Sequence, residues 1–149
     1  MKKYFVFLFA IATMISACSP AEPAPSLTGT TWKLTSYGRV DSPESAVSEE
    51  GFITFSQDGK FTGIGACNRF EGDYEVKNAQ IILSSIVWDV GGNVSCPEPQ
   101  MSQESGVWEV LKDTAGFKIE DNTLTITRKT LTQGELVLVF EAVANSTGN

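Results

Sequence analysis

Carboxylates and cysteines are the side chains of this sequence that could take part in catalysis, metal binding or covalent bonds. It has 18 Asp and Glu residues and three cysteines but no histidine. Histidine is the usual general base near neutral pH, so acid–base catalysis would need a carboxylate with a pKa shifted by burial. Glu104 is the one acid whose position suggests burial, which makes it the candidate general base if the protein is catalytic. Glu71 and Asp73 share one face of a predicted strand, but such a pair is common on solvated surfaces.

Other catalytic and binding motifs are missing or incomplete. No GxSxG elbow occurs, and Gly63-Ile64-Gly65 lacks the third glycine and the following helix of a phosphate-binding loop. The tryptophans at 32, 88 and 108 could line a ligand cavity, although aromatic residues in a small β-rich domain usually form its core. We therefore predict a protein that is not an enzyme and that has no cofactor and no metal site.

The N-terminus has the three parts of a secretory signal over residues 1–17. Two lysines precede an apolar run that is too short to span a bilayer, and small residues follow it. Residues 15–18, ISAC, resemble the lipobox of bacterial lipoproteins. This resemblance implies diacylglycerol on the Cys18 thiol, cleavage before it and acylation of the new amine. An ordinary signal peptide with an accidental cysteine is the alternative.

The segment after Cys18 reads as a tether, because residues 18–26 hold three prolines and no large apolar residue. Ser19 is not the Asp that resembles an inner-membrane retention signal, so we expect the outer membrane, facing the periplasm, in a two-membrane bacterium. Residues 27–143 form one domain of ordinary size, and residues 144–149 form a disordered tail. The net charge is −7 and there is no basic cluster, which makes nucleic acid and direct lipid adsorption poor partners.

Cys67 and Cys96 remain once Cys18 is lipidated. An even pair of thiols in an oxidising compartment predicts a disulfide. The alternative is a metal or redox pair, but neither CxxC spacing nor histidine supports it.

Short β-rich runs separated by turn residues predict an antiparallel barrel. About eight strands would close a small up-and-down barrel and remove its exposed edges. Asp58-Gly59 marks the clearest hairpin turn. The polar segment 39–50 is predicted to be a loop. The predicted strands cover 31–37, 51–56, 60–66, 69–76, 80–85, 117–120, 124–127 and 136–142.

One helix is predicted over residues 98–113, with Pro99 in its first turn. Its apolar arc holds Met101, Val107, Trp108, Val110 and Leu111. Glu104 falls inside this arc and has two interpretations. It is either a carboxylate facing the positive end of the helix dipole or a buried carboxylate with a fixed partner, for which Arg69 is our guess.

Two glycines, Gly63 and Gly65, are predicted to lie on one strand face with Phe61 and Cys67. Their missing side chains would allow a close approach or sharp curvature. We expect the helix or the loop leading into it to cover this gap, with the Cys67–Cys96 bond nearby.

Residues 65–74, GACNRFEGDY, resemble the META-domain family, which includes heat-shock-inducible outer-membrane lipoproteins of the HslJ type. Three further segments fit in order: LTGTTWKL at 27–34, Cys96-Pro97 with MSQE at 101–104, and LTI at 124–126. The resemblance implies a small, mainly antiparallel β-barrel or half-barrel with one helix. It also implies an envelope protein linked to stress or antibiotic tolerance without established catalytic chemistry. Residues 88–95, WDVGGNVS, depart from the Thr-rich segment of relatives.

The sequence therefore predicts a lipid-anchored, non-enzymatic envelope protein that acts through a protein or small-molecule contact. Candidate site residues are Asn68, Arg69, Trp88 and Glu104. A lipocalin-like carrier of an apolar ligand is one alternative, and a filled barrel interior would argue against it. An inhibitor that presents residues 88–95 to a periplasmic enzyme is another, and an exposed Trp88 on a protruding loop would favour it.

Overall fold

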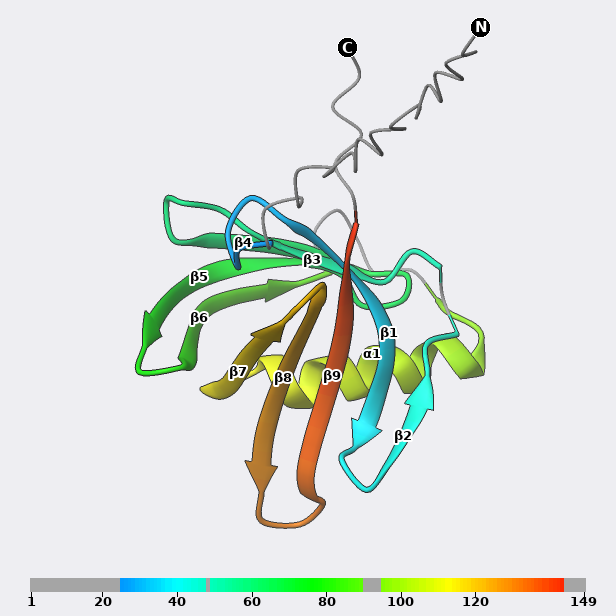
Figure 1. Ribbon diagram of the computed structural model, residues 1–149. Helices are drawn as coiled ribbons and strands as arrows, with labels where there is room; N and C mark the ends of the chain where they lie inside the picture. The colour runs from blue at the N-terminus through cyan, green and yellow to red at the C-terminus, as the bar shows by residue number, and fades with distance from the viewer. Residues whose placement is uncertain (1–24, 48, 90–94, 144–149) are drawn as a thin grey trace, which may run out of the picture.

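The computed structural model describes residues 25–47, 49–89 and 95–143. Over these residues the chain forms one antiparallel sheet and one helix, α1 (Figure 1). Eight of the strands close into a barrel through the pairing of β1 with β9, and β2 adds a further strand beside β1. The prediction of a closed antiparallel barrel with one packed helix is confirmed. The strands are β1 (Thr31–Arg39), β2 (Ser42–Ser45), β3 (Phe52–Phe55), β4 (Lys60–Ile64), β5 (Arg69–Lys77), β6 (Gln80–Trp88), β7 (Ala115–Glu120), β8 (Thr123–Thr130) and β9 (Gly134–Val143).

The strand β2 lies in the polar segment that was predicted to be a loop, and that prediction is wrong. Every residue of β2 is exposed, so no alternation of apolar and polar residues marks it in the sequence. It pairs through its backbone with the second half of β1, from Ser36 to Arg39. The first half of β1 pairs with β3 instead, over Thr31 to Lys33.

A β-bulge in β1 changes which residues face the core. The pairing with β9 shifts between Leu34 and Ser36, so the inward series runs Trp32, Leu34 and Tyr37. Strict alternation would have placed Ser36 inward, but an extra residue on one strand reverses the facing of those that follow. Tyr37 is consequently buried, with 4 % of its surface exposed.

Large side chains fill the barrel interior. The buried members of the sheet and the helix form one contiguous cluster. Its largest fully buried members are Trp32, Phe55, Phe61, Phe70 and Phe140. Packing of this kind favours a barrel that is stabilised by its own core over one that holds an apolar ligand, as in small barrels generally.

The helix α1 spans Glu98–Leu111, passes behind β8, β9 and β1 in Figure 1, and packs on the core side of these strands. Val107, Val110 and Leu111 are buried as predicted. Met101 and Trp108 are not, with 48 % and 36 % of their surfaces exposed. Two polar residues, Gln103 and Glu104, are buried instead, because the first half of the helix faces backbone polar groups of the barrel end.

Several predicted segments lie outside the described residues. These are the signal peptide over 1–17, most of the tether with Cys18, the middle of the 88–95 loop and the tail at 144–149. In the part of the chain that is described, no helix is long and apolar enough to cross a membrane.

Candidate functional site

The site is built around the connection between β4 and β5, residues 65–68. This connection closes on itself through a hydrogen bond of 3.2 Å from the Gly65 N–H to the Asn68 carbonyl oxygen. Cys67 in the connection forms a disulfide with Cys96, which lies two residues before the start of α1 at Glu98, and their Cα atoms are 6.5 Å apart. The predicted disulfide is confirmed. It joins two segments 29 residues apart in the sequence.

Glu104 holds this connection from the helix side. One carboxylate oxygen, Oε2, accepts hydrogen bonds from the backbone N–H groups of Cys67 and Asn68, at 3.1 and 3.2 Å. The other, Oε1, accepts a bond of 2.9 Å from the indole Nε1 of Trp88. The side chain is buried, with 8 % of the residue surface exposed. Burial with fixed partners is therefore the correct interpretation of Glu104, which lies beyond the first turn, where the acidic residue is Glu98.

Gln103 contributes a second set of bonds to the same connection. Its Nε2 donates to the Gly65 carbonyl oxygen at 2.7 Å, and its Oε1 accepts from the Val47 N–H at 2.7 Å. Gly51 leaves room for it, since a Cβ there would lie 3.0 Å from the Gln103 Nε2. Sequence reasoning missed Gln103. The only available signal was a polar residue next to Glu104 on an otherwise apolar face.

The predicted strand face ends early, because β4 stops at Ile64, and Gly65 and Cys67 lie in the connection that follows it, so that part of the prediction is wrong. The helix covers Gly65 as predicted. A Cβ on Gly65 would lie 3.1 Å from Trp88 Cζ2 and 3.4 Å from the Glu104 carboxyl carbon. At Gly63 the missing side chain serves the sheet itself, because a Cβ would lie 2.4 Å from both the Phe52 carbonyl oxygen and a ring carbon of Phe70. Gly65 is therefore needed for the approach of the helix and Trp88, whereas Gly63 is needed for packing within the sheet.

Trp88 ends β6 and packs inward. Its ring stacks on Phe70 with a centroid distance of 4.7 Å and an interplanar angle of 13°. On another side it meets Trp108 edge-on, at 5.2 Å and 70°. Trp88 is partly buried and hydrogen-bonded to Glu104, so it lacks the exposed position on a protruding loop that would have favoured the inhibitor alternative.

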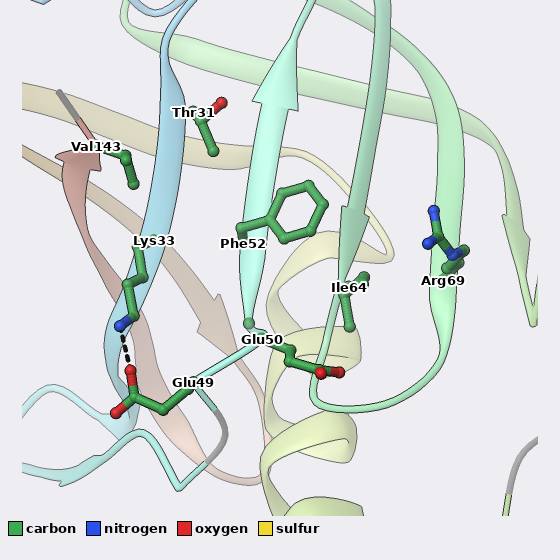
Figure 2. Close-up of a pocket in the computed structure, with 9 residues that line it drawn as sticks. Thr31, Lys33, Glu49, Glu50, Phe52, Ile64, Arg69 and Val143 are labelled. Atoms are coloured by element: carbon green, nitrogen blue, oxygen red, sulfur yellow. Dashed lines mark hydrogen bonds and ion pairs between the residues drawn. The ribbon is translucent and has the colours of Figure 1, made fainter. Parts of the chain in front are cut away.

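Arg69 is not the partner of Glu104, and that guess is wrong. The Arg69 side chain is exposed on β5, on an outer surface of the barrel. Figure 2 shows it beside a shallow pocket of about 360 Å³ that also includes Lys33 on β1 and Glu49 and Glu50 ahead of β3. Lys33 and Glu49 form an exposed ion pair there. The neighbour of Arg69, Asn68, is buried instead, with its Nδ2 at 3.9 Å from Cys96 Sγ.

A smaller pocket of about 270 Å³ opens beside Glu104, which we call the tryptophan pocket. It is lined by Trp88, Glu104, Ser105 and Trp108. Ser105 and Trp108 lie on the exposed side of α1. Two of the candidate residues predicted from the sequence, Trp88 and Glu104, are thus brought together, whereas Arg69 lies apart from them.

The family model of the META domain matches residues 25–144, which is most of the sequence. The chain belongs to the META domain family. This assignment confirms the resemblance drawn from residues 65–74 and the three accompanying segments.

Solved structures share the fold of this META domain at low sequence identity. An NMR structure of a protein from Burkholderia xenovorans is 19 % identical, with a TM-score of 0.58, covering 90 % of this chain and 99 % of that one. A second NMR structure is 18 % identical, with a TM-score of 0.54 and coverages of 73 % and 86 %. The crystal structure of a DUF4847 family protein from Bacteroides vulgatus is 14 % identical, with a TM-score of 0.51 and coverages of 76 % and 93 %. No curated protein matches the sequence.

The META domain brings three potential metal ligands together at this site. The sulfur atoms of Cys67 and Cys96 and a Glu104 oxygen lie within 4.8 Å of one another. Metals bind cysteine as the thiolate. With the two sulfur atoms bonded to each other, this cluster has no thiolate to offer.

Nearby lysine side chains lower the pKa of two surface carboxylates of the META domain. The hydrogen bond from Lys60 Nζ, at 2.5 Å, lowers the pKa of Asp73, and a bond from Ser85 lowers it further. Lys33 lowers the pKa of Glu49 in the same way. A lowered pKa makes these carboxylates weaker proton acceptors and moves their pKa further from neutral pH, which suits exposed ion pairs and does not suit a general base.

Proposed function

We propose that this chain is a lipid-anchored, non-enzymatic META-domain protein of the bacterial cell envelope. In this proposal Cys18 carries the lipids, and the domain acts by binding a protein or a small molecule. The biological outcome we propose is tolerance of envelope stress or antibiotics. The anchor and the outcome are drawn from the sequence resemblances, and the binding role is drawn from the geometry.

The observation that carries the proposal is the use made of Glu104. Its two oxygens accept three N–H donors, two of which belong to the backbone of residues 67 and 68. A carboxylate committed in this way positions a loop, and it would have to give up one of these bonds to take a proton from a substrate. The best candidate for a general base thus serves to hold the site in place.

The disulfide supports an extracytoplasmic location. Such bonds persist in oxidising compartments and are rare in the cytosol. Cys67–Cys96 lies within the barrel end that carries the tryptophan pocket, so oxidation rigidifies the surface that we assign to binding.

Two experiments test the proposal. Metabolic labelling with a radioactive fatty acid should label the wild type and not a Cys18→Ala variant, whose signal should remain uncut. Crosslinking in living cells, followed by mass spectrometry, should recover one partner reproducibly from cells with the wild type and should not recover it from cells with the variant that lacks the anchor. Maturation and membrane partition of Cys18→Ala like the parent would refute the anchor. Turnover of a substrate by the purified wild type would refute the non-enzymatic role.

A further inference from the structure

One aromatic wall of the tryptophan pocket, Trp88, is held in place by several contacts. Trp88 is fixed by its stack on Phe70 and by its hydrogen bond to Glu104, and Gly65 leaves space behind it. The Trp108 ring stands at 70° to the Trp88 ring, so the two indoles form walls in different planes. A wall held as Trp88 is loses little conformational entropy when a ligand binds.

The lining of the pocket also includes a buried carboxylate, that of Glu104. Among the described residues, neither lysine nor arginine forms an ion pair with this carboxylate. Its partners are N–H groups, which stabilise the negative charge without cancelling it. In the described part of the chain, three N–H groups donate to the two carboxylate oxygens, which together offer about four lone-pair positions. The net charge of −7 for the whole chain adds to the attraction for cations.

We propose that the tryptophan pocket binds a compact organic ammonium group. Cations are attracted to the faces of aromatic rings, most strongly to tryptophan, and sites of this kind recognise quaternary ammonium ligands. Glu104 supplies the opposite charge, and Ser105 supplies a polar group at the rim. At about 270 Å³, the pocket is smaller than sites for drug-sized ligands, so it suits a headgroup or a small amine.

This inference rests on the proposed binding function and states the chemistry of its ligand. The ammonium group could belong to a free small molecule or to a lipid headgroup, and both present the same cation to the pocket. The test below does not depend on lipidation or on a cellular partner. Its failure would therefore leave the anchored-binding proposal standing with a different ligand.

The test is an NMR titration of the mature protein, purified in a maltoside detergent, with choline chloride. Its three tryptophans give three indole N–H signals. Trp32 is an internal control, because it is fully buried and its Nε1 donates to the Leu27 carbonyl oxygen. We expect saturable shifts of the Trp88 and Trp108 signals and none of Trp32. The neutral carbon isostere of choline, 3,3-dimethylbutan-1-ol, should bind at least tenfold more weakly.

Variants separate binding from folding. Trp108→Ala should weaken choline binding at least tenfold while leaving the Trp32 signal unchanged, because Trp108 is exposed on the helix. Trp108→Phe should restore part of the binding, since a phenyl ring keeps a weaker cation–π interaction. Met101→Ala, at an exposed position of α1 that does not line the pocket, is the matched control and should bind like the wild type.

Reconstitution distinguishes the two sources of the ligand. A lipid headgroup as the ligand predicts that phosphatidylcholine nanodiscs shift the Trp108 signal where phosphatidylglycerol nanodiscs do not. A free small molecule predicts the same response to added choline in both. Either result supports the site. Absence of saturable shifts, equal binding of the neutral isostere, or unchanged binding by Trp108→Ala would overturn it.

Discussion

Replacing Glu104 with glutamine changes one oxygen of a buried acceptor into a donor while keeping the shape of the side chain. The amide oxygen can keep the two backbone N–H bonds now made by Oε2, from Cys67 and Asn68. Its NH₂ group then faces the Trp88 Nε1–H, which now lies 2.9 Å from a carboxylate oxygen. Two donors would meet at a buried position. The opposite orientation would leave two backbone donors unsatisfied instead of one, so we expect the first.

The cost follows from the bonds that change. Losing one hydrogen bond to a charged group costs about 1.5 to 3 kcal/mol. The two bonds that remain weaken as well, because a neutral amide oxygen is a poorer acceptor than a carboxylate. We expect Glu104→Gln to lower the free energy of unfolding by about 3 kcal/mol. For a domain of this size, that lowers the melting temperature by about 10 °C.

Urea unfolding of the oxidised protein, followed by circular dichroism, measures this change. Glu109→Gln is the matched control, since it makes the same substitution on the same helix. In the described part of the chain, the Glu109 side chain forms a partly exposed ion pair with Lys112, and the loss of this pair should cost less than about 1 kcal/mol.

A double-mutant cycle identifies the responsible bond. In a Trp88→Phe background the conflicting indole donor is gone, so Glu104→Gln should cost about 1 to 2 kcal/mol less than in the wild type. An equal cost in both backgrounds, or a cost no greater than that of Glu109→Gln, would refute the assignment. An enzymatic activity of the wild type that vanished in Glu104→Gln, under conditions in which the variant remains folded, would instead assign Glu104 to catalysis.

Three further predictions follow from other parts of the fold. Thiol labelling of unfolded, unreduced protein should detect neither Cys67 nor Cys96, and quantitative labelling of both would contradict the disulfide. Replacing both cysteines with serine should lower the free energy of unfolding by about 3 kcal/mol, because the bond closes a loop of about 30 residues. Gly63→Ala should lower the free energy of unfolding by well over about 1 kcal/mol, because the new Cβ would lie 2.4 Å from a backbone oxygen. Gly116→Ala should lower it less, because its Cβ would come no closer than 3.3 Å to a side-chain oxygen. Equal urea midpoints for the two variants would contradict this difference. Burial raises the pKa of Tyr37 above 10.0. The contribution of Tyr37 to the free energy of unfolding should therefore be complete below about pH 10 and be lost as the pH rises through the folded-state pKa. Urea unfolding at a series of alkaline pH values should show a smaller loss of stability in Tyr37→Phe than in the wild type.

Local sequence signals predicted most of the sheet because each strand carries its own pattern. In β8, Leu124 and Ile126 alternate with threonines and are buried. The turn at Asp58-Gly59 could be predicted because an Asp-Gly pair favours a tight turn with glycine at a positive φ, and Gly59 adopts a φ of 81°. The strand β2 was not readable, because its four residues are all exposed and it forms only by pairing with β1.

The helix shows where pattern reasoning failed. Its apolar arc predicted burial of Val107, Val110 and Leu111 correctly. The same arc placed Met101 inside, although that residue is half exposed. A helical projection assumes a uniformly apolar surface opposite the helix, but the first half of α1 packs on backbone N–H and C=O groups, which select Gln103 and Glu104.

The sequence by itself determined the barrel class, the family, the pairing of Cys67 with Cys96 and the prospect that Glu104 is buried. The barrel class and the burial of Glu104 follow from periodicity, and the cysteine pairing follows from the number of cysteines and an oxidising compartment. The family rests on the resemblance of residues 65–74 and three further segments to the META domain. The partners of Glu104 were decided only by the tertiary structure. Closure of the barrel places Arg69 on an outer surface and brings Trp88 across from the helix, and hydrogen-bond partners depend on distances in space that no interval along the chain specifies.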